Sequence, residues 1–115
     1  MKPIRALKGC IENIPHLHLH ILLTDEDEVV VARCLDFSVS SHGKDEVEAL
    51  SSLSDSIKDY VEYALEHDAL NGIIDPEEDV FWKVYKELEL QDEALIIKES
   101  ADTLKVGKIK KVTYA

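Results

Sequence analysis

The sequence predicts an α+β fold: an antiparallel β-meander of about three strands is packed by a long helix, followed by a second helix and C-terminal strands. Two patterns carry this prediction. Over residues 16–40, polar and apolar residues alternate or form short β-branched runs, as they do in strands. Over residues 45–70, apolar residues recur with a period of about 3.6 residues, as on the buried face of a helix. Consecutive strands before a helix favour an antiparallel sheet with the helix on one face.

Three strands are expected before the long helix. Histidines alternate with apolar residues over residues 16–21, which is the side-chain alternation of a strand. Residues 24–28 form a polar, acidic turn, and residues 29–35 are β-branched and apolar enough for a second strand. Residues 37–40 are expected to form a short third strand.

The long helix is expected over residues 45–70. Asp45 and Glu48 have the spacing of a capping box, with Asp in the role usually taken by Ser or Thr. Asn71 and Gly72 supply a left-handed residue that commonly ends a helix. The apolar stripe consists of Leu50, Leu53, Ile57, Tyr60, Val61, Ala64 and Leu65.

A second helix is expected from residue 75. Asp75 can cap it, and Pro76 fits the first helical position. Trp82 lies beside the apolar face, as a flank of the core or as an exposed contact residue. The apolar face consists of Val80, Phe81, Val84, Tyr85 and Leu88.

Both ends of the chain are basic and compatible with strands. Residues 95–97 and 104–114 are expected to be strands, with a bulge at Gly107. Residues 3–14 fit a strand or a poor helix. The two ends could pair with each other or with a second protomer. The tail lysines either protect a strand edge, which is the more frequent role, or contact phosphate.

The chain is expected to be a single domain, residues 1–115, with a ββ(β)α core over residues 17–70 and a helix plus β extension over residues 75–115. No apolar run approaches the length of a membrane span and no secretory signal is visible, so a soluble, cytoplasmic protein is expected. Cys10 and Cys34 are expected to be reduced thiols.

The net charge of −11 is unevenly distributed. Residues 25–103 hold 23 of the 24 acidic residues, but only six of the 13 basic ones. Such an acidic middle disfavours nucleic acid as a direct partner, because phosphate affinity depends on Lys and Arg. It suits a basic partner through electrostatic steering. The alternative is that the acids only keep a small protein in solution.

An ordered set of short motifs runs from residue 17 to residue 66. In chain order they read Val31-Ala32-Arg33-Cys34-Leu35-Asp36, Ser41-His42-Gly43, Glu48-Ala49-Leu50 and Ile57-Lys58-Asp59-Tyr60-Val61-Glu62. In this order the segment resembles the HicB-like antitoxin family, in which a meander is followed by an amphipathic helix with an aromatic residue near its end. Gly43 would allow a sharp turn from strand to helix, and Ala49 would let the helix approach the sheet closely.

The resemblance implies a binding protein that sequesters a small basic HicA-type toxin, an mRNA-cleaving enzyme, by covering its active surface. Family antitoxins usually carry a C-terminal DNA-binding module. Residues 72–115 contain no basic helix suited to a major groove, which indicates a stand-alone member without direct DNA binding. The candidate partner-binding residues are Asp25, Glu26, Asp27, Glu28 and Asp36.

No catalytic, cofactor or metal site is predicted. His16, His18 and His20 would share one side of a strand, where they could chelate a metal or simply fill a half-exposed sheet face. No further ligand follows with convincing spacing. The acidic turn lacks the spacing and the glycine of a calcium loop. Neither a nucleophile elbow nor a phosphate-binding loop occurs, so an enzyme is not expected.

The sequence is compatible with two functions. The first is the HicB-like antitoxin, or a binding module derived from one. The second is a structural or oligomerisation protein of the same fold with no toxin partner, in which the basic ends complete a sheet between protomers. Either way a homodimer or higher homo-oligomer is expected.

Overall fold

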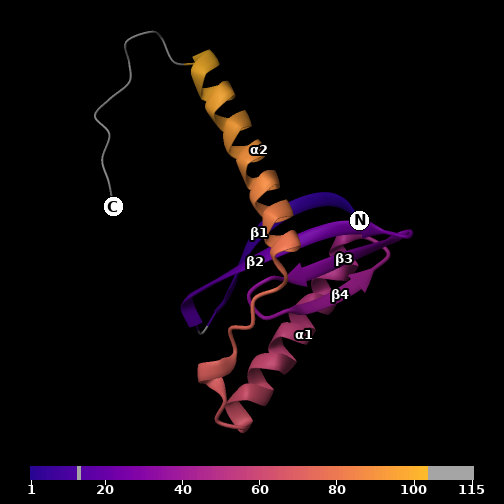
Figure 1. Cartoon of the computed structure of the whole chain (residues 1–115), viewed down its shortest axis with the longest axis vertical. Coiled ribbons are helices and arrows are strands. Elements are labelled where there is room, and N and C mark those ends of the chain that lie inside the picture. The colour runs from indigo at the N-terminus through magenta and orange to yellow at the C-terminus, as the bar shows by residue number, and fades with distance from the viewer. Residues whose placement is uncertain (13, 104–115) are drawn as a thin grey trace.

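The structure is a computed structural model that describes residues 1–12 and 14–103, and its fold is α+β, as predicted (Figure 1). A four-stranded sheet precedes two helices. The elements are β1 (Lys2–Ile11), β2 (Ile14–Glu26), β3 (Val29–Cys34), β4 (Val39–Gly43), α1 (Glu46–Glu66), the short 3₁₀ helix η1 (Leu70–Gly72) and α2 (Asp79–Thr103).

The sheet is an antiparallel meander in the order β1-β2-β3-β4. It has four strands and not three, because residues 2–11 form a strand that pairs with β2 from Lys2 opposite Asp25 to Ile11 opposite Ile14. The last strand begins two residues later than predicted. Residues 35–38 form the turn between β3 and β4, and Ser38 adopts a left-handed φ of 55° there.

The two faces of the sheet bury different cores, because successive side chains of a strand point to opposite sides. One face packs against α1, which lies over β3 and β4. The other packs against the first half of α2. The α1-side core includes Leu19, Ile21, Leu23, Ala32, Cys34, Phe37, Ala49, Leu53, Val61 and Ala64. The α2-side core consists of Leu22, Leu35 and Tyr85, flanked by Ala6, Phe81, Trp82, Val84 and Leu88.

Helix α1 begins as predicted and ends earlier. The Asp45 carboxylate accepts a hydrogen bond from the Glu48 N–H at 2.8 Å, which caps the helix. The Glu48 carboxylate accepts from the Lys44 N–H at 3.4 Å and not from the Asp45 N–H, so the capping box is offset by one residue. The helix ends at Glu66 and not at residue 70, because Asp68 takes the left-handed conformation, with φ of 53°.

Gly43 and Ala49 allow α1 to start close against the sheet. A Cβ atom on Gly43 would lie 2.5 Å from the Ala49 nitrogen and 2.8 Å from the Glu48 carbonyl carbon. Ala49 itself is fully buried. The glycine is therefore required by close packing at the strand-to-helix junction.

Helix α2 begins at Asp79, so the predicted start at residue 75 was wrong. The backbone N–H groups of Asp75 and Glu77 donate to the carbonyls of Asp36 and Leu35, each at 2.8 Å. These bonds hold residues 75–77 in an extended path beside the turn between β3 and β4, so these residues cannot form the first turn of a helix. Trp82 is half-buried at the edge of the α2-side core, which is the flanking position.

The predicted strand at residues 95–97 was also wrong, because α2 continues through Thr103. The short apolar run is flanked by Glu, Ala and Lys, whose helix propensity outweighs it. The strand predicted over residues 104–114 lies outside the described residues.

The second half of α2 projects from the body of the molecule (Figure 1). The radius of gyration is 17.4 Å, whereas a compact chain of this length would have about 13 Å. None of the described helices is long and apolar enough to cross a membrane.

Candidate partner-binding surface

Four of the predicted partner-binding residues lie at the tip of the β2–β3 hairpin. Asp25 and Glu26 end β2, and Asp27 and Glu28 form the turn. The φ angles of Asp27 and Glu28 are 49° and 69°, so both turn residues are left-handed, as a type I′ hairpin turn requires. Glycine, asparagine and aspartate usually fill such positions, so Asp27 is an ordinary choice and Glu28 is the exception. Residues held in disfavoured backbone conformations concentrate at functional sites.

Three of these four carboxylates face solvent. Asp25, Asp27 and Glu28 are exposed. Glu26 is different, because its carboxylate accepts hydrogen bonds from Arg33 Nη1 at 2.9 Å and from the Thr24 hydroxyl at 2.8 Å. The hydrogen bond from Arg33 holds the pKa of Glu26 below its usual value, with Thr24 contributing in the same direction.

Arg33 ties the hairpin to α2. Its Nη1 also donates to the Thr24 hydroxyl at 3.0 Å, and its guanidinium lies 4.4 Å from the centre of the Phe81 ring. Thr24 is fully buried beneath this group. The Glu26 carboxylate therefore anchors the hairpin. We call the three exposed residues Asp25, Asp27 and Glu28 the hairpin tip; they project from this anchored base.

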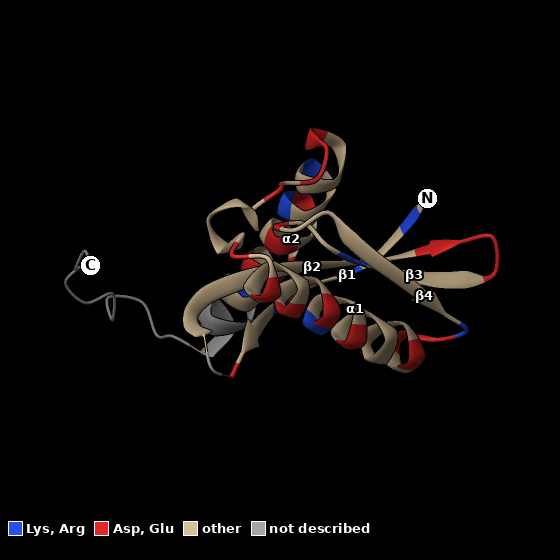
Figure 2. Ribbon diagram, turned by 90° about the horizontal axis from the view of Figure 1, so that it is seen from below, with Lys and Arg blue, Asp and Glu red and all other residues tan. Residues whose placement is uncertain are grey.

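The start of α1 lies at the same end of the sheet as the hairpin tip. Val30 pairs with Gly43, so the last strand delivers the helix close to the hairpin. Glu48 is exposed there, and Glu46 pairs with Arg5 at 3.0 Å. Figure 2 shows the acidic hairpin and the acidic first turns of α1 at one end of the molecule. This end carries acidic side chains on two adjoining elements.

The structure does not bring Asp36 to the hairpin tip. Asp36 lies in the turn after β3, at the opposite end of that strand, and only 12% of its side chain is exposed. Its carboxylate accepts the backbone N–H of His20 at 2.7 Å and lies 3.0 Å from His20 Nδ1. Asp36 thus holds His20 and the adjoining turn in place.

His20 lies beside two aromatic side chains of α2. Its ring centre lies 5.2 Å from that of Trp82 and 5.4 Å from that of Tyr85. The Asp36–His20 pair has the form of an oriented base. However, no serine, threonine or cysteine among the described residues is hydrogen-bonded to the imidazole. Through these contacts the pair joins β2, the turn after β3 and α2.

The other two histidines of the alternating run, His16 and His18, are exposed along β2. In the part of the chain that the structure describes, no three His, Cys, Asp or Glu side chains are grouped as a metal site. Cys10 and Cys34 are both free thiols. Burial raises the pKa of the Cys34 thiol to about 11.

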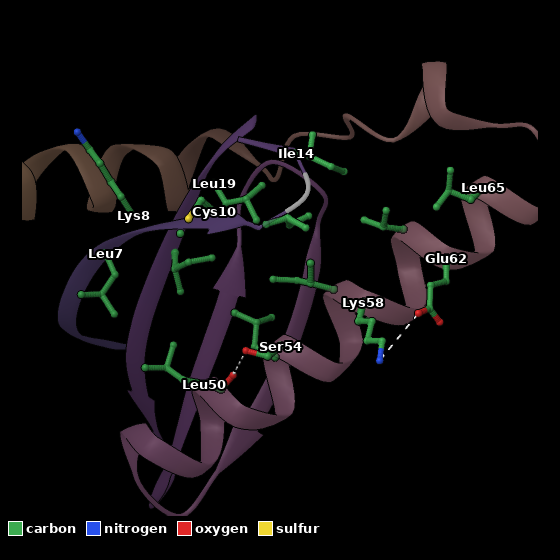
Figure 3. Close-up of a pocket in the computed structure, with 16 residues that line it drawn as sticks. Leu7, Lys8, Cys10, Ile14, Leu19, Leu50, Ser54, Lys58, Glu62 and Leu65 are labelled. Atoms are coloured by element: carbon green, nitrogen blue, oxygen red, sulfur yellow. Dashed lines mark hydrogen bonds and ion pairs between the residues drawn. The ribbon is translucent and has the colours of Figure 1, made fainter. Parts of the chain in front are cut away.

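Sequence reasoning missed a groove between α1 and the β1–β2 hairpin, which we call the α1 groove. It has a volume of about 670 Å³. Figure 3 shows Leu50 across from Leu7 at one end of the groove and Leu65 on the side of Ile14 at the other end, with Lys58 and Glu62 at the rim. The sequence did contain a signal for this groove. The apolar stripe of α1 is wider than the face that packs on β3 and β4, so the residues at its edge line the groove. Leu65, predicted to be buried, is 56% exposed at this edge.

Comparison with known proteins identifies no relative: no family model, no curated protein and no solved structure matches the chain.

Proposed function

We propose that this chain is an HicB-like antitoxin, or a binding module derived from one, that sequesters a small basic mRNA-cleaving toxin. It acts by binding and not by catalysis. The observation that carries the proposal is the hairpin tip, where Asp25, Asp27 and Glu28 are exposed on a tightly anchored turn. The resemblance of residues 17–66 supplies the class of partner.

The surroundings of the hairpin tip support this role. The tip has no part in either core, and its two turn residues adopt a conformation that costs stability. A rigid acidic projection suits a basic surface that normally receives RNA phosphates, because opposite charges steer encounter and fix orientation. The carboxylates occupy the phosphate positions, and the sheet end behind them excludes the RNA.

Co-expression tests the proposal directly. The proposal predicts that a small basic protein is encoded beside this chain's gene. That protein should arrest growth when expressed alone, and the wild-type chain should restore growth and co-purify with it. A variant with Asp25→Asn, Asp27→Asn and Glu28→Gln should restore growth poorly, because it removes the three exposed charges.

A matched control separates local from overall charge. Asp55→Asn, Asp59→Asn and Glu66→Gln neutralise three exposed acids of α1 and change the net charge equally. This variant should rescue growth as well as the wild type. Absence of any complex between the wild-type chain and the neighbouring basic protein would refute the proposal.

A second candidate is a structural protein that acts by self-association without a toxin. The second half of α2, where Leu90, Leu95 and Ile96 are exposed, favours this alternative. An orphan gene, with no short basic neighbour, would favour it over the first.

A further inference from the structure

Arg33 carries a positive charge on the face of the sheet that packs against α2. It pairs with Leu22 across β2 and β3, and directly opposed residues share a face. Leu22 belongs to the α2-side core. The Arg33 side chain is only 15% exposed, and a cation withdrawn from water is costly unless it is paired. The partners of Arg33 therefore decide whether its charge is stable there.

These partners come from two directions. Within the sheet, Arg33 Nη1 donates to the Glu26 carboxylate at 2.9 Å and to the Thr24 hydroxyl at 3.0 Å. From α2, the centre of the Phe81 ring lies 4.4 Å from the guanidinium carbon. A guanidinium group donates hydrogen bonds in its plane and stacks an aromatic ring on its face. One side chain can therefore bind the hairpin and the helix at the same time.

The ring of Phe81 also strengthens the hydrogen bond between Arg33 and Glu26. A ring that covers one face of the guanidinium keeps water from that face, and a charged hydrogen bond is stronger where water is excluded. The Glu26 side chain is 30% exposed, so water already reaches this bond from the outer side. Loss of the ring would admit water from the helix side as well. Phe81 therefore stabilises a hydrogen bond that it does not itself make.

Glu26 transmits this restraint to the hairpin tip. It pairs with Val29 as the last pair before the turn, and Asp27 and Glu28 follow it directly. The left-handed backbone of Glu28 is disfavoured, so the turn keeps its shape only while the strands at its base stay paired. A firm contact at Glu26 therefore holds the exposed carboxylates in one arrangement.

We propose that Phe81 is a positioning residue for the hairpin tip, and that it acts through Arg33 and Glu26 to hold the tip ready for a basic partner. Its effect on the partner rests on the proposed function, whereas its effect on the hairpin is a property of the free chain. A tip held in one arrangement loses less conformational freedom on binding and therefore binds more tightly.

Substitutions at Phe81 test this role in the free chain. Phe81→Leu keeps an apolar side chain but removes the ring, so the amides of Glu26 and Val29 should exchange with solvent about fivefold faster. The pKa of the Glu26 carboxyl, which the hydrogen bond from Arg33 lowers, should rise toward its usual value in an NMR titration. Phe81→Tyr keeps the ring and should match the wild type in both measurements.

Leu88→Ala is the matched control. Leu88 flanks the same core but lies two turns of α2 beyond Phe81, about 10 Å away along the helix. The substitution removes a similar amount of apolar side chain, so urea denaturation should show that both variants lose stability. Only Phe81→Leu should raise the pKa of Glu26 and speed exchange at the base of the hairpin. Equal changes in the two variants, or an unchanged Glu26 pKa in Phe81→Leu, would overturn the proposal.

Binding to the basic protein encoded beside the gene separates this inference from the proposed function. Phe81→Leu should bind that protein roughly fivefold more weakly. Its salt dependence should equal that of the wild type, because the charges of the hairpin tip remain. Wild-type affinity in Phe81→Leu would refute positioning for the partner. If the wild-type chain binds no such protein, the proposed function fails, and exchange and titration of the free chain still decide whether Phe81 holds the hairpin.

Discussion

Gly43 is the residue on which the junction between sheet and helix depends. Its backbone lies so close to the first turn of α1 that a methyl group would overlap backbone atoms of Glu48 and Ala49. Backbone atoms cannot move aside as the end of a flexible side chain can. We therefore expect Gly43→Ala to lower the free energy of unfolding by about 2 kcal/mol, measured by urea denaturation.

Gly72 provides the matched control for that substitution. An added Cβ there meets no atom within 4 Å. Gly72→Ala should change stability by less than about 1 kcal/mol, because it only restricts the unfolded chain. Equal effects of the two substitutions would show that the close approach at Gly43 is unimportant.

Glu26 gives the molecule a pH-dependent stability contribution. Its pKa is lowered from 4.5 chiefly by the hydrogen bond from Arg33. A carboxyl group with a lowered folded-state pKa stabilises the protein above its unfolded-state value, and this contribution is lost as the pH falls through the lowered pKa. Glu26→Gln should thus destabilise by about 1 kcal/mol at neutral pH.

The pH dependence of that difference is the informative measurement. Urea denaturation of wild type and Glu26→Gln should give converging stabilities as the pH falls well below 4.5. Asp59→Asn is the control at an exposed site, and its stability should differ little from that of the wild type both at neutral pH and in acid. A constant gap between wild type and Glu26→Gln across this range would mean that the ionised carboxylate is not what Arg33 recognises.

At the scale of the elements, α2 is fixed to the sheet by one buried hydroxyl as well as by apolar packing. Tyr85 is 2% exposed, and its hydroxyl donates to the Leu7 carbonyl at 3.1 Å. Burial raises the pKa of this phenol. Tyr85→Phe keeps the ring but leaves the carbonyl without this donor, so stability should fall by about 1 kcal/mol.

Hydrogen exchange locates the effect of that substitution. Amides in the first half of α2 should exchange faster in Tyr85→Phe, and those of α1, on the opposite face, should be little changed. Uniform acceleration throughout the molecule would contradict a local role for the hydroxyl.

Periodicity was sufficient to predict α1 and the first half of β2. The stripe of α1 follows from burial of one helix face, and the cap at Asp45 is local chemistry. The alternation over residues 16–20 marks the part of β2 with one exposed side, whereas residues 21–24 are buried on both faces. The start of α2 could not be predicted this way. Asp75 and Pro76 have the local chemistry of a helix start, but the backbone hydrogen bonds to the turn after β3 prevent it. A contact so distant in sequence leaves no local signal.

The same distinction holds for the candidate site. The exposure of Asp25, Asp27 and Glu28 could be predicted, because these residues surround a hairpin turn and turns are exposed. Asp36 was grouped with them by charge alone. The pairing that places it beside His20, at the other end of the strand, depends on the register of the sheet.

For the molecule as a whole, the acidic end and the α1 groove are separate surfaces. The hairpin tip and the start of α1 form the acidic end, whereas the α1 groove is lined mostly by apolar side chains (Figures 2 and 3). A partner held at the hairpin tip therefore leaves the groove uncovered.

Calorimetric titration of the purified basic neighbour into this chain tests most directly whether the hairpin tip binds it. The wild type should bind, with affinity falling as salt rises, because exposed charges are screened. The variant with Asp25→Asn, Asp27→Asn and Glu28→Gln should bind roughly tenfold more weakly, with a shallower salt dependence, and the variant with Asp55→Asn, Asp59→Asn and Glu66→Gln should match the wild type. Equal affinity of both variants would contradict the assignment of binding to the hairpin tip.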